Sequence, residues 1–245
     1  MSRSSSAGEA GRGGRRGMKV AEIFYSIQGE GRLAGVPSAF VRTSGCNLRC
    51  GFCDTDFTSW HPEGEALSVA EVLARLRDFP ARHVVVTGGE PLIAPEIEEL
   101  CAALRRAGYH ITVETAATVF KPVECDLASL SPKLSNSTPH QREGGRNAFR
   151  HEALRLQPDV IRAFVERYDY QLKFVIDRPE DVAEALELLE RLPGVDRERV
   201  LLMPQGVTRA ELDERGPWLA EACKRHGFRY CPRLHIELYG NRRGT

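Results

Sequence analysis

Three cysteines lie close together in the stretch GCNLRCGFCDT and give the clearest chemical signal in the sequence. Cys46, Cys50 and Cys53 have the spacing C-x3-C-x2-C. Cysteine thiolates are the usual ligands of iron–sulfur clusters, and a cluster normally has four of them. Three ligands leave one iron open to a substrate or cofactor. The spacing therefore predicts a cluster that takes part in chemistry rather than one that only carries electrons.

A zinc site is the alternative interpretation of these cysteines, because zinc also prefers thiolates. A closed structural zinc site needs four ligands, and Asp54, Asp56 or His61 would have to supply the fourth. The chain would then be a non-enzymatic zinc- or cluster-binding module, with its basic amino-terminal residues available for tRNA. The ligand count favours the cluster.

A glycine-rich turn, VVVTGGEP, follows the cysteines at residues 84–91. Its two glycines let the backbone approach a ligand closely, and Glu90 can accept a hydrogen bond from an ammonium group. Together, the cysteine spacing and this turn resemble the radical S-adenosylmethionine superfamily. In that superfamily, S-adenosyl-L-methionine binds the open iron of a 4Fe-4S cluster, and the Gly-Gly-Glu motif binds its amino group.

Three further stretches narrow the resemblance. SIQGEG at residues 26–31, SPK at 131–133 and the carboxyl-terminal LHIELYGNRRGT are similar to 7-carboxy-7-deazaguanine synthases of the queuosine and deazapurine pathways. The similarity covers residues 18–245. It implies a lyase that converts 6-carboxy-5,6,7,8-tetrahydropterin to 7-carboxy-7-deazaguanine with loss of ammonia. It also implies a 4Fe-4S cluster, S-adenosyl-L-methionine, Mg2+, a homodimer, a flavodoxin- or ferredoxin-like electron donor, and a product for tRNA modification or other purine metabolism.

The resemblance implies roles for individual residues and assigns no catalytic side chain beyond the cluster and the adenosyl radical. The cluster ligands would be Cys46, Cys50 and Cys53, and the magnesium ligand would be Thr55. S-adenosyl-L-methionine would be bound by Phe52, Cys53, Asp54, Gly89, Glu90, Ser131, Pro132, Lys133, Lys173 and Gln205. The pterin would be bound by Ile27, Gln28, Gly29, Glu30, Arg42, Thr87, Glu114 and His235.

Simple chemistry supports several of these roles. The planar guanidinium of Arg42 can bind the pterin carboxylate through two hydrogen bonds. Glu114, Glu30 and the Gln28 amide can accept hydrogen bonds from the guanidine-like edge of the pterin. The Thr55 hydroxyl offers the oxygen that magnesium prefers. Purely structural alternatives are a strand-end position for Arg42, a turn cap for Glu114 and a core position for His235.

One stretch departs from the family pattern. After Glu114 the family often has Thr-Gln/Asn-Gly-Thr, whereas this chain has Thr115-Ala116-Ala117-Thr118. Alanine tolerates positive φ poorly, so the loss of the glycine leaves open the local backbone conformation and, with it, the role of Glu114.

An activating enzyme of the same superfamily, which takes a hydrogen atom from a glycine of a partner protein, is a further alternative. Such an enzyme would share the cysteine loop. It gives no account of the IQGEG and GNRRGT stretches and would need a groove for a peptide.

The predicted site residues are far apart in the sequence, so the fold must bring them together. Parallel strands that end at the same edge of a sheet would do so. From Val84 onward, short apolar runs alternate with amphipathic segments, which is typical of β-then-α units around a parallel sheet. Apolar residues at helical spacing predict helices after the capping residues Ser68 and Thr208, and around Leu100 and Leu186. Six strands are expected at Ala39–Thr43, Val84–Thr87, His110–Glu114, Leu127–Leu130, Leu172–Ile176 and Val200–Met203.

Six units are too few to close the usual eight-fold barrel. The expected fold is therefore α/β, an open partial (β/α)6 TIM-like barrel of the radical SAM type, with its chemistry at the carboxyl ends of the strands. Segment Pro132–Leu156 is polar and glycine-rich and is expected to form a long loop or lid.

The composition fits one sizeable domain. The 245 residues include 34 basic and 34 acidic side chains, so the chain has no net charge and no direct binding to nucleic acid is expected. Seven cysteines without a signal peptide or a membrane-length apolar run indicate reduced thiols in a cytoplasmic protein that binds no membrane. Residues 1–17 are expected to form a disordered basic arm, and residues 18–245 a single radical SAM domain.

Overall fold

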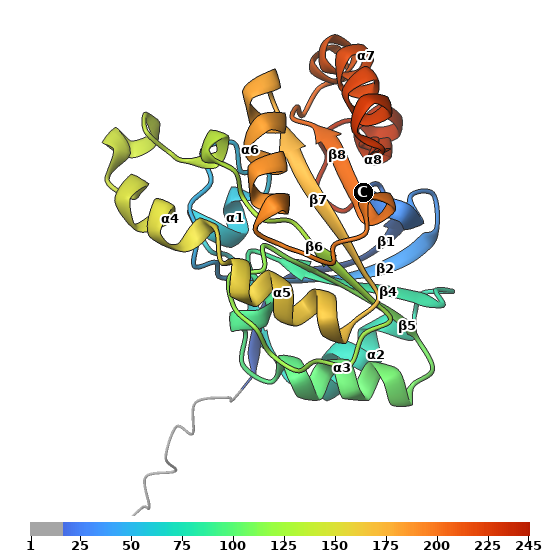
Figure 1. Cartoon of the computed structure of the whole chain (residues 1–245). Helices are drawn as coiled ribbons and strands as arrows, with labels where there is room; N and C mark the ends of the chain where they lie inside the picture. The colour runs from blue at the N-terminus through green and yellow to red at the C-terminus, as the bar shows by residue number, and fades with distance from the viewer. Residues whose placement is uncertain (1–16) are drawn as a thin grey trace, which may run out of the picture.

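A computed structural model describes residues 17–245 of the chain. The expected basic arm at residues 1–17 therefore lies outside the described residues, apart from Gly17. The nine strands of residues 17–245 form a single sheet in the order β3-β1-β2-β4-β5-β6-β7-β8-β9. The edge strands β3 and β9 do not pair with each other, so the sheet is an open partial barrel, as predicted (Figure 1).

All six predicted strands are present, and they pair in parallel in the order of the sequence. Because parallel strands end at the same edge of a sheet, the loops that follow them gather there. These strands are β2 (Pro37–Thr43), β4 (His83–Gly88), β5 (His110–Thr115), β6 (Leu127–Leu130), β7 (Tyr170–Ile176) and β8 (Val200–Pro204).

Three strands were not predicted: β1 (Met18–Ile27), β3 (Glu65–Leu67) and β9 (Arg229–Tyr230). β1 pairs antiparallel with β2 and β3, and β9 adds in parallel to β8. Phe24 of β1 stacks on Phe40 of β2 with ring centroids 4.7 Å apart. β3 and β9 are too short to show a period, and the partly exposed side chains of β1 do not alternate regularly.

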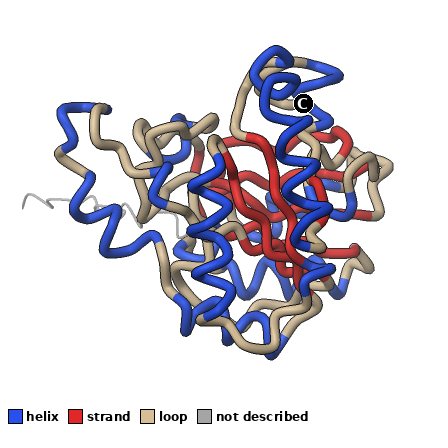
Figure 2. Tube along the Cα trace, turned by 45° about the horizontal axis from the view of Figure 1, so that its top comes forward, coloured by secondary structure: helices blue, strands red, loops and turns tan. Residues whose placement is uncertain are grey.

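Helices line the outside of the strands (Figure 2). The capping boxes at Ser68 and Thr208 are formed, as predicted, and Gly227 ends the last long helix. The helices are α1 (Asp56–Ser59), α2 (Val69–Leu76), α3 (Ile97–Arg106), α4 (Ala148–Arg155), α5 (Pro158–Arg167), α6 (Pro179–Glu190), α7 (Arg209–His226) and α8 (Leu234–Tyr239). Short 3-10 turns are Gly31–Leu33, Pro91–Ile93, Ser135–Ser137, Arg142–Gly145 and Arg197–Arg199.

Segment Pro132–Leu156 is not a long loop throughout. It contains two of the 3-10 turns and then α4, whose buried residue is His151. α4 was not predicted because glycines and polar residues dominate the first half of the segment and the helix itself has only a small apolar face. The segment packs against the cysteine loop, because Gly51 N donates to Ser137 O at 2.7 Å.

Side chains of the parallel strands alternate between the helix-covered core and the inside of the barrel. In β7, Leu172, Phe174 and Ile176 belong to the main apolar core. Lys173 and Val175 face the inside instead and line a pocket. β7 is thus buried on both faces, with the charged Lys173 on the pocket side and apolar side chains on the helix side. Within residues 17–245, every helix falls short of the length or apolarity needed to cross a membrane.

Candidate active site

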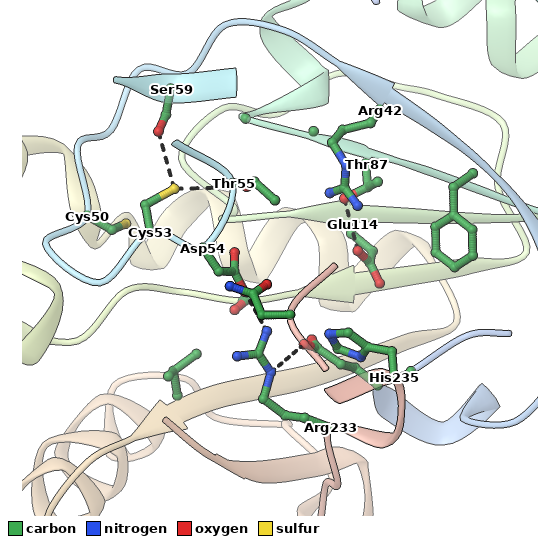
Figure 3. Close-up of a pocket in the computed structure, with 18 of the residues that line it drawn as sticks. Arg42, Cys50, Cys53, Asp54, Thr55, Ser59, Thr87, Glu114, Arg233 and His235 are labelled. Carbon is green, nitrogen blue, oxygen red and sulfur yellow. Dashed lines mark hydrogen bonds and ion pairs between the residues drawn. The ribbon is translucent and has the colours of Figure 1, made fainter. Parts of the chain in front are cut away.

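The pocket lies inside the partial barrel, at the carboxyl ends of its strands. Its volume is about 440 Å³, within the usual range for small-molecule sites. Cys50, Cys53 and Thr55 lie on one side of it, and Arg42 and Glu114 lie opposite (Figure 3). Of the predicted site residues, only Glu90 and Pro132 are absent from its lining.

The cysteine loop follows β2 and is fixed by its own short helix. Gly45 N donates to Thr58 O at 2.8 Å, and the indole Nε1 of Trp60 donates to Cys50 O at 3.0 Å. The sulfur of Cys53 lies 3.2 Å from the Ser59 hydroxyl (Figure 3). These bonds place the loop before any metal is bound.

The three cysteines are suited to hold a cluster. All are free thiols that line the pocket. Burial raises the pKa of Cys46 and of Cys50 to about 12, and binding of a metal would replace the protons of these thiols. Among residues 17–245, no three His, Cys, Asp or Glu side chains are placed to hold a single metal ion. In a cluster, each thiolate binds a different iron.

The glycines of the Gly-Gly-Glu turn make room for the cysteine loop. A Cβ on Gly89 would lie 2.2 Å from Gly45 O and 2.8 Å from the Cβ of Cys46. Glu90 N donates to Gly45 O at 2.9 Å. The sequence predicted that these glycines let the backbone approach a ligand closely. In the structure, the missing side chain of Gly89 lets the turn after β4 approach the cysteine loop.

The Glu90 side chain is not part of the pocket lining, and its contact with S-adenosyl-L-methionine stays a prediction. Glu90 is fully buried behind the pocket wall, and its carboxylate accepts hydrogen bonds from Leu92 N, the Thr115 hydroxyl and Ala116 N. Burial raises its pKa despite these bonds. Because the bonds occupy the carboxylate, Glu90 joins the turn after β4 to the end of β5.

Pro132 is the second predicted residue that the structure keeps out of the pocket. It is buried, whereas its neighbours Ser131 and Lys133 line the pocket. The Lys133 ammonium donates to the Ser131 hydroxyl at 2.8 Å. The SPK motif therefore supplies two polar side chains to the pocket, and its proline packs behind them.

Glu114 is the centre of the opposite wall. Its Oε1 accepts from the Gln28 amide at 3.0 Å, and its Oε2 accepts from the Thr87 hydroxyl at 2.9 Å. Three residues predicted to bind the pterin therefore meet, although they are distant in the sequence. Each carboxylate oxygen keeps a lone pair for a further donor.

Arg42 is oriented by a residue that the sequence analysis did not identify. Its Nε donates to Glu22 Oε1 at 2.7 Å, with both side chains mostly buried. Glu22 Oε2 accepts from Arg243 Nε at 3.1 Å, and Arg243 also binds Glu63 at 2.9 Å. No hydrogen bond joins the terminal nitrogens of Arg42 to another residue of the described chain, so they are available to an anion.

Glu30 lies in a buried ion-pair network. Its carboxylate pairs with the ammonium of Lys173 and, at 3.0 Å, with the guanidinium of Arg233, which also pairs with Asp54. Burial alone would raise the pKa of Glu30, but the two cations outweigh it and hold that pKa far below its ordinary value. Lys173 thus lines the pocket with its charge already matched, and Arg233 was missed by sequence reasoning.

His235 approaches the chain where only glycine leaves space. A Cβ on Gly29 would lie 1.9 Å from His235 Nδ1. Burial lowers the pKa of His235, although the nearby Glu30 opposes that shift. The histidine is therefore neutral at pH 7, and it lines the pocket beside Arg233 (Figure 3).

Known proteins that match this chain belong to the family that its sequence motifs resemble. The model of the radical SAM superfamily matches residues 40–215. The 7-carboxy-7-deazaguanine synthase of Halobacterium salinarum is 45% identical over 234 residues, which cover 91% of each chain. The synthase of Rhodopirellula baltica is 44% identical over 227 residues, which cover 92% of this chain and 88% of that one. The chain belongs to the 7-carboxy-7-deazaguanine synthase family.

A solved structure supports the assignment. The crystal structure of QueE from Escherichia coli matches with a TM-score of 0.65 and 25% identity, and covers 87% of this chain and 92% of that one. The resemblance drawn from the cysteine, glycine and carboxyl-terminal motifs is thereby confirmed. The activating enzyme and the zinc-binding module are not favoured by these matches.

The stretch after Glu114 that departs from the family pattern contains a left-handed residue. Ala117, which takes the place of the synthase family's glycine, has φ +54°, and its N–H donates to the Thr115 hydroxyl at 3.0 Å. A left-handed alanine costs about 1–2 kcal/mol. The surrounding hydrogen bonds hold this strained residue in place.

The contact between the turn after β4 and the cysteine loop gives a testable prediction for this synthase-family chain. Gly89→Ala should force the two loops apart, destabilise the cluster-free protein by about 1–3 kcal/mol and lower its cluster content. Urea unfolding and iron and sulfide analysis after reconstitution measure both effects. Gly51→Ala is the control, because its Cβ would make ordinary contacts of 3.6 Å. Equal cluster contents in the two variants would contradict the prediction.

Proposed function

We propose that the chain catalyses the conversion of 6-carboxy-5,6,7,8-tetrahydropterin to 7-carboxy-7-deazaguanine with loss of ammonia, as a radical SAM lyase. The observation that carries this proposal is a single pocket with the cluster cysteines on one wall and the Arg42 and Glu114 groups on the opposite wall (Figure 3). A substrate bound between the walls would face the radical source. The family membership supports the same reaction.

Binding of the pterin is the task that the opposite wall suits. Arg42 offers its terminal nitrogens to the pterin carboxylate, while Glu22 holds Nε and so fixes the plane of the guanidinium. Glu114, steadied by Gln28 and Thr87, accepts hydrogen bonds from the guanidine-like edge. The two interactions together would orient the carbon that bears the carboxylate.

The cysteine wall is proposed to hold the cofactors. Cys46, Cys50 and Cys53 would bind the 4Fe-4S cluster. S-adenosyl-L-methionine would be contacted by Phe52, Asp54, Gly89, Ser131, Lys133 and Gln205, all of which line the pocket. When bound, these cofactors supply a 5′-deoxyadenosyl radical that removes one hydrogen atom from the substrate. The protein positions the reactants and excludes water.

Magnesium is proposed to bind at Thr55. The Thr55 side chain lines the pocket, and its one contact in the described residues is with the Cys53 sulfur at 3.9 Å. The hydroxyl is therefore free for a hard cation that takes its other ligands from the substrate and water. Such a cation would stabilise the carboxylate during ring contraction.

The remaining expectations concern the cellular setting. All seven cysteines are free thiols, which supports a reducing, cytoplasmic location. We further propose that residues 18–245 act as one radical SAM domain, that the enzyme is a homodimer, and that a flavodoxin- or ferredoxin-like protein donates the electron. The small-molecule pocket supports a pterin substrate rather than nucleic acid.

Product analysis tests the function directly. Anaerobic, reduced enzyme with a reconstituted cluster should form 7-carboxy-7-deazaguanine and ammonia from the carboxytetrahydropterin when S-adenosyl-L-methionine is present. Mass spectrometry identifies the product, and omission of each component is the control. If the enzyme cleaves S-adenosyl-L-methionine but forms no deazaguanine, the substrate assignment is wrong.

Replacement of the carboxylate-binding arginine should weaken substrate binding. Arg42→Lys loses the second hydrogen bond to the carboxylate, so KM for the pterin should rise about 10- to 100-fold with a smaller change in kcat. Steady-state kinetics measures both constants. Arg32→Lys is the matched control, because Arg32 pairs with Asp169 outside the pocket lining. An unchanged KM in Arg42→Lys would remove Arg42 from the site.

The magnesium proposal has its own test. Thr55→Ala should lower turnover and raise the magnesium concentration needed for half-maximal rate, because one oxygen ligand is lost. The visible absorption of the cluster should stay unchanged. Ser44→Ala, at a hydroxyl outside the pocket lining, is the control. The same magnesium response in both variants would count against Thr55 as a ligand.

A further inference from the structure

A basic surface with an exposed aromatic residue is formed by α4, and it belongs to neither wall of the pocket. Phe149 is 88% exposed, and the side chain of Arg146 is 71% exposed. Arg150 is exposed and forms no ion pair with any residue in 17–245. These three residues are called the α4 surface below. α4 stands away from the body of the molecule at the left of Figure 1.

The α4 surface is held against the cysteine loop by a buried histidine. His151 Nδ1 accepts from Arg49 N at 3.1 Å, and its Nε2 lies 2.9 Å from the Ser137 hydroxyl. Burial lowers the pKa of His151 to about 4, so the ring is neutral and keeps these two roles at pH 7. Arg49 directly precedes Cys50, so the His151 ring connects α4 to the backbone of the cysteine loop.

A second connection runs through Trp60. The guanidinium of Arg142, in the turn before α4, lies 4.2 Å from the centre of the Trp60 ring. The Trp60 indole in turn donates to Cys50 O at 3.0 Å. The segment that carries the α4 surface is thus connected to the cysteine loop through both His151 and Arg142.

The charge of this segment differs from that of the whole chain. Residues 140–155 hold four arginines and two glutamates, whereas the full sequence is balanced. Arg155 forms ion pairs with Glu152 and Glu184, and Arg146 forms one with Glu143. The unmatched charge of Arg150 therefore lies beside the exposed ring of Phe149. An aromatic residue with arginines around it is typical of the centre of a protein interface.

We propose that the α4 surface is the docking site of an acidic one-electron carrier protein, which reduces the cluster through the cysteine loop. The inference rests on the proposed function, because a radical SAM reaction consumes an electron. The carrier loses one electron and the cluster gains it. Acidic residues of the carrier would face Arg146 and Arg150, and the Phe149 ring would be covered on docking. A transient carrier needs only such a small interface.

Charge reversal on the α4 surface tests the proposal. In Arg146→Glu/Arg150→Glu, the second-order rate constant for cluster reduction by an enzymatically reduced, acidic flavodoxin should fall about tenfold or more. Stopped-flow absorption without pterin measures it. Reduction by dithionite should stay unchanged. The binding of oxidised flavodoxin to the reconstituted enzyme, measured by calorimetry, should weaken in parallel, and Phe149→Ser should weaken it with no change in charge.

The matched control is Arg209→Glu/Arg225→Glu on α7, which changes the net charge equally at two exposed arginines. A loss as large in this control, or an equal loss with dithionite, would overturn the proposal. So would unchanged flavodoxin kinetics together with a change in oligomeric state by light scattering, because the surface would then join two copies of the chain. Pterin turnover driven by dithionite tests the proposed function separately.

Discussion

The carboxylate of Glu30 connects parts of the chain that are far apart in the sequence, and the shape of the pocket depends on it. Through Lys173 it joins the loop after β1 to β7, and through Arg233 it joins the chain before α8 to Asp54 of the cysteine loop. Removing one member of a buried pair typically costs about 3–5 kcal/mol, because the partner's charge is left without a match. The two walls are therefore held at a fixed separation by electrostatics as well as by the sheet.

The strands, and a group of three free cysteines in one loop, could be predicted because their signals are local. A run such as Val84–Thr87 is apolar, short and bounded by turns, and the three cysteines lie within a few residues of each other. β1 was missed because its side chains, between the antiparallel neighbours β2 and β3, are buried without a regular alternation. Residues such as Glu22 and Arg233 act only through partners at distant positions, and no spacing in the sequence reveals such a pair.

Glu90 and Pro132 show that a motif can be recognised from the sequence although the contacts of its side chains cannot. Both lie in motifs of the family, but hydrogen bonds and packing keep their side chains out of the pocket lining. Ala117 has a positive φ that its side chain disfavours, and a hydrogen bond to Thr115 holds it there. In each case the surrounding contacts, rather than the residue type, decide the conformation.

Trp60 has a consequence beyond the support of its loop. Its indole donates a hydrogen bond to the backbone of Cys50, a predicted cluster ligand. Iron–sulfur clusters absorb in the near-ultraviolet region where indole emits, so a cluster at this cysteine would quench the fluorescence of Trp60. The indole would then give the protein an intrinsic optical reporter of cluster assembly.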